Sequence, residues 1–139
     1  MNIHEKIKME EGDKALAYQC PAGKWTIGAG IKLEQQPMPQ DLRDIWLERI
    51  IMDNWIKVND RLVSEYNFGF IDLGSDVPTV LQDMAYQLGV SGLFQFKKML
   101  SAIAEKDYRR AANELLDSKY ARQTPNRANR NAELLRGCE

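Results

Sequence analysis

The sequence is poor in the residues that build disulfide frameworks and metal sites. Its 139 residues include two cysteines, Cys20 and Cys138, and one histidine, His4. Neither cysteine stands in a cluster with ligand spacing, so we predict no disulfide scaffold and no metal site. A Ser-His-acid triad cannot be built around so isolated a histidine. We expect no cofactor, and any hydrolytic chemistry has to come from carboxylates.

Long apolar runs are missing as well. No stretch reaches the ~18–20 uninterrupted apolar residues of a membrane-spanning helix. The first 14 residues carry seven charged side chains, which leaves no apolar core for a signal peptide. The small residues Gly28-Ala29-Gly30 lack the spacing and the lysine of a phosphate-binding loop. We therefore expect a product that begins in the cytoplasm and binds no nucleotide.

An excess of charge of one sign is also absent. The chain has 19 Lys and Arg against 20 Asp and Glu, which gives no global case for nucleic-acid binding. The distribution is uneven, because residues 39–83 hold nine acids and four bases whereas residues 84–139 hold six acids and ten bases. The basic end could face an anionic polymer, although a solvated surface is the simpler interpretation.

Hydrophobic periodicity divides the chain into segments. Residues 2–11 have the spacing of a short amphipathic helix, and Gly12 follows where a C-terminal cap belongs. Alternating residues on both sides of residues 21–23 (PAG) predict a β-hairpin. A long helical pattern then covers residues 41–66. Further helical patterns cover four segments towards the C-terminus, at about 78–88, 94–105, 107–118 and 126–135.

This order of segments predicts an α+β architecture in one domain, residues 1–139. We expect a β-hairpin lobe at residues 13–40 and a connecting helix at 41–66. A helical lobe would combine residues 1–12 with 67–139.

Three residues are candidates for chemistry, and each also has a plain structural explanation. Glu11 stands at the end of the first helix, where the negative end of the helix dipole disfavours ionisation, as a general acid requires. A solvated surface carboxylate is the more common role for such a residue. Thr26 is explained by β-propensity and Cys20 by its small apolar side chain. Taken singly, these residues do not decide the function.

Taken together, the residues form a more specific pattern. Residues 11–12 (EG), 17–18 (AY) and 20–30 (CPAGKWTIGAG) resemble the signature of glycoside hydrolase family 24, the phage-type lysozymes. Two later segments, 86–89 (YQLG) and 123–130 (QTPNRANR), resemble the same family in order and spacing. The resemblance covers nearly the whole chain and is weakest over the connecting helix. It implies a lysozyme-like α+β fold.

The resemblance also implies a reaction, hydrolysis of the β-1,4 bond between N-acetylmuramic acid and N-acetylglucosamine in bacterial peptidoglycan. This reaction needs a proton donor for the leaving oxygen and, in an inverting mechanism, a water on the opposite face of the sugar. By the family pattern Glu11 is the donor, and Thr26 with Cys20 holds the water. Arg127 would pair with Glu11 and orient it.

Two positions depart from the family pattern. The best-known member has Asp at the position of Cys20, although other members also carry Cys; a thiol supplies less negative charge than aspartate at neutral pH. The thiol could accept a hydrogen bond from the water as a thiolate, act as a nucleophile, or leave Thr26 to position the water. Ile31 stands where the family usually has His, which removes a structural ion pair and no catalytic group.

The glycan is expected to bind in a cleft between the two lobes. The substrate-binding candidates are Gly30 and Lys32 in the hairpin lobe and Tyr86 and Gln87 in the helical lobe. A core position is the alternative for Tyr86. The basic segment 84–139 could then be attracted to the bacterial wall, because the wall is anionic.

These expectations describe a bacteriolytic phage endolysin. It would be made in the host cytoplasm as a monomer, without nucleic-acid partner or stable membrane insertion, and would reach periplasmic peptidoglycan after a separate holin-like protein permeabilises the membrane. Two alternatives stay open: a non-hydrolytic glycan-binding descendant, suggested by Cys20, and a lytic transglycosylase, in which an intramolecular hydroxyl replaces water. Retention of Glu11 with Thr26 favours the hydrolase over both.

Overall fold

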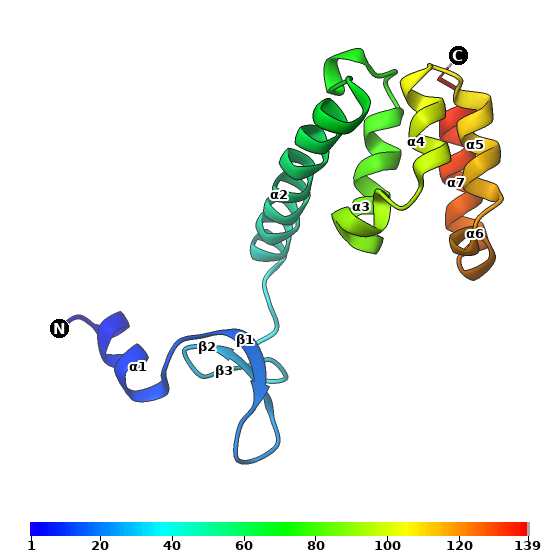
Figure 1. The fold of residues 1–139 in the computed structure, drawn as a ribbon. Coiled ribbons are helices and arrows are strands. Elements are labelled where there is room, and N and C mark those ends of the chain that lie inside the picture. The colour runs from blue at the N-terminus through cyan, green and yellow to red at the C-terminus, as the bar shows by residue number, and fades with distance from the viewer. Residues whose placement is uncertain (139) are drawn as a thin grey trace. The chain divides into compact units, whose positions relative to one another are not determined.

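The computed structural model describes residues 1–138 and divides into two compact units, Met1–Trp46 and Leu47–Glu139. The N-terminal unit holds a short helix and a small sheet, and the C-terminal unit is helical (Figure 1). The boundary falls within the long helix α2 (Gln40–Tyr66). None of the helices described over residues 1–138 is both long and apolar enough to cross a membrane.

Helix α1 (Ile3–Glu11) is closed at both ends by residues that the sequence supplies. The Asn2 side chain accepts a hydrogen bond from the Glu5 N–H at 2.9 Å, and the Glu5 carboxylate accepts one from the Asn2 N–H at 3.0 Å. This reciprocal capping box satisfies donors that the first turn leaves unpaired. Gly12 ends the helix with a φ of +79°, a left-handed conformation that favours glycine. The two caps place Glu11 at the last helical position.

Three short strands form one antiparallel sheet in the order β1-β2-β3, with bounds β1 (Lys14–Gln19), β2 (Trp25–Gly28) and β3 (Ile31–Lys32). The Cys20 N–H donates to the Lys24 carbonyl at 2.9 Å and the Gly23 N–H to the Cys20 carbonyl at 2.8 Å, which closes the turn between β1 and β2.

Thr26 occupies the middle of this sheet. It lies opposite Tyr18 in β1 and opposite Lys32 in β3. Its side chain is 2% exposed, and it is the one buried residue among residues 1–46. The sheet therefore holds Thr26 rigidly from both sides.

The C-terminal unit contains most of α2 and a cluster of further helices. Their bounds are η1, a 3₁₀ turn (Phe70–Asp72), α3 (Val77–Leu93), α4 (Lys97–Ala104), α5 (Tyr108–Leu116), α6 (Lys119–Gln123) and α7 (Pro125–Arg136). Helices α4, α5 and α7 lie side by side in Figure 1, and α5 packs against both of the others.

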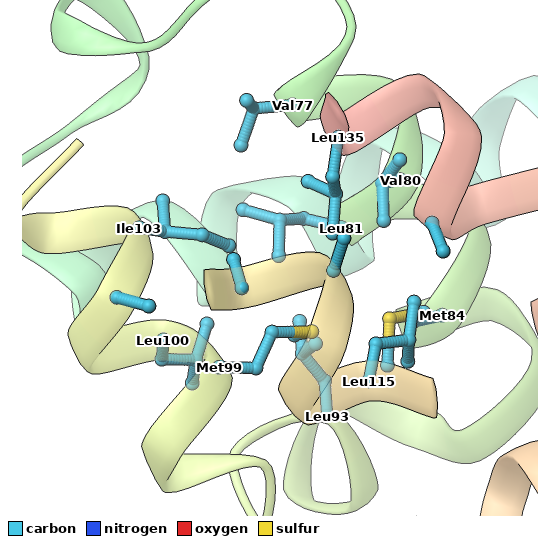
Figure 2. Packing of buried hydrophobic residues seen from close by; sticks show 14 of the residues in the cluster. Val77, Val80, Leu81, Met84, Leu93, Met99, Leu100, Ile103, Leu115 and Leu135 are labelled. Carbon is cyan, nitrogen blue, oxygen red and sulfur yellow. The ribbon is translucent and has the colours of Figure 1, made fainter. Parts of the chain in front are cut away.

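One apolar core fills the C-terminal unit. Figure 2 shows side chains from α3, α4, α5 and α7 meeting in it, among them Leu81, Met84, Leu100 and Leu115, all with no exposed surface. Burying a side chain of this size stabilises the fold by about 1.5–3 kcal/mol relative to exposure. Val58 and Leu62 bring α2 into the same core.

The predicted α+β class is confirmed, and most predicted helices appear within a few residues of their expected bounds. The helix expected at 78–88 is interrupted at Gly89, whose φ of +78° is not helical, and a further helical turn follows to Leu93. The helix expected at 94–105 begins only at Lys97, after turns at Phe94 and Gln95. A short helix, α6, and a short strand, β3, were not expected. The prediction that residues 1–12 belong to the helical lobe stays a prediction.

Candidate active site

The side chain of Glu11 projects from the end of α1 and touches the backbone of Gly30. Gly30 has a φ of +72°, and a Cβ atom placed on it would come within 2.8 Å of Glu11 Oε2 and 3.1 Å of Glu11 Cδ. A Cβ atom essentially never approaches another heavy atom so closely, so only glycine fits here without displacing the carboxylate. Glu11 itself is exposed and makes no hydrogen bond or ion pair within residues 1–138. The carboxyl group thus lies against Gly30 and is open to solvent.

Cys20 and Thr26 lie together at the turn between β1 and β2. The Thr26 hydroxyl donates a hydrogen bond to the Lys24 carbonyl at 2.9 Å, and its oxygen lies near the Cys20 sulfur. Because Thr26 is buried and Cys20 is half-buried, the sulfur is the more accessible of the two polar groups.

The surroundings of Cys20 favour its thiolate form. Backbone N–H groups of Lys24 and Ala22 face the sulfur, as does the Thr26 hydroxyl, and Lys32 adds a positive charge nearby. The Lys24 contact is the largest cause, and together these groups lower the pKa of the Cys20 thiol against the opposing effect of partial burial. The Cys20 thiol therefore loses its proton more readily than the thiol of a free cysteine.

Arg127 lies on α7 in the C-terminal unit and is held by a carboxylate of α3. Its Nε donates to Asp83 Oδ2 at 3.0 Å and its Nη2 to Asp83 Oδ1 at 2.5 Å. The Arg127 hydrogen bond is the main reason that the pKa of Asp83 lies below its usual range. The predicted pairing of Arg127 with Glu11 joins residues of the two units and stays a prediction.

Asn131, one turn further along α7, completes this cluster. Its amide donates to Asp83 Oδ2 at 2.9 Å and lies 3.5 Å from the Tyr120 hydroxyl. Asn131 is 5% exposed and Tyr120 6%. Burial is the main cause that raises the pKa of Tyr120, so its hydroxyl stays neutral at physiological pH.

Tyr86 and Gln87 follow Asp83 on α3. Tyr86 is half-exposed and borders a cavity of about 310 Å³, whose lining is Leu47, Ile51, Thr79, Gln82, Asp83 and Tyr86. The Gln87 side-chain oxygen is buried without a hydrogen-bond partner among the described residues. An unpaired buried acceptor of this kind costs about 1–3 kcal/mol.

The predicted site residues of the N-terminal unit form two separate groups. Glu11 contacts Gly30, and Cys20 contacts Thr26 with Lys32 nearby, all in the N-terminal unit. Ile31, the position where a histidine is usual, is exposed at the start of β3. Over residues 1–138 no group of three or more His, Cys, Asp or Glu side chains is placed to hold a metal ion.

Sequence reasoning missed Asp83 and Asn131. Asp83 precedes Tyr86 by three residues and Asn131 follows Arg127 by four, so each shares a helix face with a residue that had been singled out. That spacing was the available signal. Their pairing across 48 residues of sequence could not be read from either helix alone.

Three known proteins resemble this chain over most of its length. "Probable T4-type lysozyme 2" and "Probable T4-type lysozyme 1" of Dictyostelium discoideum are each 27% identical to it over 157 aligned residues, covering 93% of this chain and 90% of the relative. "Pre-baseplate central spike protein Gp5" of Enterobacteria phage T4 is 25% identical over 154 residues, covering 94% of this chain and 27% of that protein.

A family comparison agrees with these relatives. The sequence model described as "Phage lysozyme" matches residues 8–133, which include Glu11, Cys20, Thr26 and Arg127. The match spans nearly the whole of both units. This chain therefore belongs to the phage lysozyme family.

Proposed function

We propose that this chain cleaves the β-1,4 bond between N-acetylmuramic acid and N-acetylglucosamine, with Glu11 as general acid and Cys20 and Thr26 as the groups that position the attacking water. As a member of the phage lysozyme family, the chain is a lysozyme that hydrolyses peptidoglycan. The observation that carries the finer proposal is the packing of the Glu11 carboxyl group against Gly30.

Glu11 suits the role of proton donor. Glycoside hydrolysis requires a carboxylic acid beside the leaving oxygen, held in one place while the bond breaks. The absence of a side chain at Gly30 leaves room for the carboxyl group at this position, and solvent exposure leaves room for a sugar to approach it. No other carboxylate within residues 1–46 has a glycine backbone packed this closely against it.

Cys20 and Thr26 suit the placement of a water. The Thr26 hydroxyl proton is directed to the Lys24 carbonyl, which leaves the oxygen lone pairs free to accept a hydrogen bond. The Cys20 sulfur, whose pKa is lowered, is a second acceptor at the accessible side of the pair. Two acceptors on one water orient its protons towards the protein and its lone pair outwards, as an attack on the anomeric carbon requires.

Other residues support this reaction in the proposal. Arg127 supplies a positive charge that orients Glu11, and Lys32, Tyr86 and Gln87 contact the glycan. A half-exposed ring such as Tyr86 suits stacking on a sugar.

The biological setting is part of the same proposal. We place the enzyme as a monomeric endolysin that is made in the host cytoplasm and degrades the wall to lyse the host. A separate holin-like protein would give it access to the periplasm. The ten Lys and Arg residues of segment 84–139 support attraction to an anionic wall. Cell-wall hydrolysis that does not change with ionic strength would contradict this last point.

Replacement of Glu11 tests the catalytic assignment. Glu11→Gln keeps the size of the side chain but removes the ionisable proton, so we expect lysis of outer-membrane-stripped bacteria to slow by about 100- to 10,000-fold. The measurement is the fall of turbidity with time. Glu10→Gln is a matched control on the same helix, since Glu10 is exposed and pairs with Lys6. Equal clearing by wild type and Glu11→Gln would contradict the assignment.

A further inference from the structure

We infer that Asp83 is a positioning residue for the lysozyme reaction, which fixes the guanidinium of Arg127 in the orientation that the reaction uses. This inference rests on the proposed function, in which Arg127 supports Glu11. Neither the family pattern in the sequence nor the predicted site included Asp83.

The geometry of the pair is that of a clamp. Two Arg127 nitrogens, Nε and Nη2, donate to the two oxygens of the Asp83 carboxylate, at 3.0 Å and 2.5 Å. Such a two-point contact fixes the plane of the guanidinium as well as its position. Nη1 has no hydrogen-bond partner among the residues that the structure describes, so the clamp leaves donors free for another group.

Asp83 is itself fixed from the protein side. The buried amide of Asn131 donates to Asp83 Oδ2 at 2.9 Å, and the Tyr120 hydroxyl lies 3.5 Å from the same amide. Asn131 and Tyr120 are both more than nine-tenths buried. The carboxylate that orients Arg127 is therefore anchored to the core of the C-terminal unit.

This ion pair differs from the others within residues 1–138. The side chains of Asp83 and Arg127 are 31% and 35% exposed, whereas both partners are more than 40% exposed in the pairs Lys6–Glu10, Lys8–Asp13, Lys24–Glu34, Arg61–Glu65 and Glu105–Arg110. The pair also joins two helices 44 residues apart in sequence. Arg61 and Glu65 form an equally bidentate pair, but within one helix and in solvent. Reduced solvent screening makes the Asp83 clamp the more effective of the two.

A purely structural role is the competing explanation, since the clamp also ties α3 to α7. The two roles predict different couplings. A positioning residue acts through Arg127, so its removal has no further effect on turnover once Arg127 is gone. A structural residue lowers the melting temperature and leaves turnover by the folded enzyme unchanged.

The test is a double-mutant cycle measured on purified peptidoglycan at a temperature where every variant is folded. The variants are Asp83→Ala, Arg127→Ala and the double replacement, with Glu65→Ala as a control that removes a bidentate carboxylate elsewhere in the unit. We expect Asp83→Ala to lower kcat/KM about tenfold, mainly through kcat. Asp83→Asn keeps one acceptor and should recover part of this loss. Melting temperatures are recorded for all variants.

The outcomes separate this inference from the proposed function. Equal kcat/KM for Arg127→Ala and the double variant, with a normal value for Glu65→Ala, supports the clamp. Additive losses, or a lower melting temperature for Asp83→Ala with unchanged kcat/KM, overturn it. No effect of Arg127→Ala also overturns it, while the Glu11 assignment stands as long as Glu11→Gln is inactive. Full activity of Glu11→Gln instead defeats the proposed function.

Discussion

The two units differ in what holds them together. Within residues 1–46 Thr26 is the one buried side chain, whereas the C-terminal unit buries a continuous apolar core that runs from Val58 to Leu135. The N-terminal unit is defined by backbone geometry: a capped helix, a closed turn and glycines with positive φ. A segment of this size without a core has too little apolar burial for independent stability.

The difference concerns function as well as stability. Glu11, Cys20 and Thr26 lie in the unit with little burial, and the clamp on Arg127 lies in the unit with the core. Regions with few buried apolar contacts have low local stability, and functional segments are often drawn from them. The comparison predicts that core changes will reduce stability, and that changes at the N-terminal glycines will reduce activity first.

The largest expected effect on stability is in the core of the C-terminal unit. Leu81→Ala removes a side chain with no exposed surface, and we expect a loss of about 2–5 kcal/mol in the free energy of unfolding. Leu16→Ala in β1 is the matched control, because Leu16 is 83% exposed and its truncation should change stability by less than about 0.5 kcal/mol. Denaturant unfolding followed by circular dichroism measures both. Similar losses of unfolding free energy for the two variants would contradict the claim that only the C-terminal unit depends on an apolar core.

A smaller effect is expected at Gly30, and it should appear in activity. Gly30→Ala places a Cβ within 2.8 Å of Glu11 Oε2, so the carboxylate has to move, and a displacement of about 1 Å in a catalytic group costs about 100-fold in rate. Gly23→Ala is the control: its φ is +78°, close to that of Gly30, but nothing lies within 4 Å of the added Cβ. Both variants carry similar backbone strain, and only Gly30→Ala should lose activity. Equal losses would assign the effect to strain.

Much of the N-terminal unit could be predicted from sequence, because its signals are local. Asn2, Glu5 and Gly12 mark the ends of α1, and residues 21–23 (PAG) mark the hairpin turn. The long periodic pattern of α2 was equally clear. Each signal depends on residues fewer than five positions apart, which is the range over which backbone propensity acts.

The remainder depended on tertiary contacts. The Asp83 clamp joins α3 and α7 across 44 residues, and an acid and an arginine at that separation give no local sign of pairing. The burial of Thr26 follows from its place between two neighbouring strands, one of them the unexpected β3. Glycine at position 89 signalled a break, but no local signal marked the further turn that ends at Leu93, a residue buried in the core.

The smallest effect is expected at Cys20. Because its pKa is lowered, alkylation by iodoacetamide should reach half its maximal rate at a lower pH than for a free cysteine. Cys20→Ala should reduce lysis by less than Glu11→Gln does, since Thr26 remains to position the water. A larger loss at Cys20 would instead make the sulfur the principal group. Alkylation is followed by mass spectrometry of the peptide containing Cys20.

The central claim is that Glu11 and a positioned water hydrolyse the glycan. Purified peptidoglycan is digested with wild type and Glu11→Gln, and the released sugar ends are identified by mass spectrometry, with the initial anomer determined by proton NMR. We predict reducing N-acetylmuramic acid ends of inverted configuration from the wild type, and almost none from Glu11→Gln. Ends of the 1,6-anhydro type, which form when an intramolecular hydroxyl replaces water, would contradict the account.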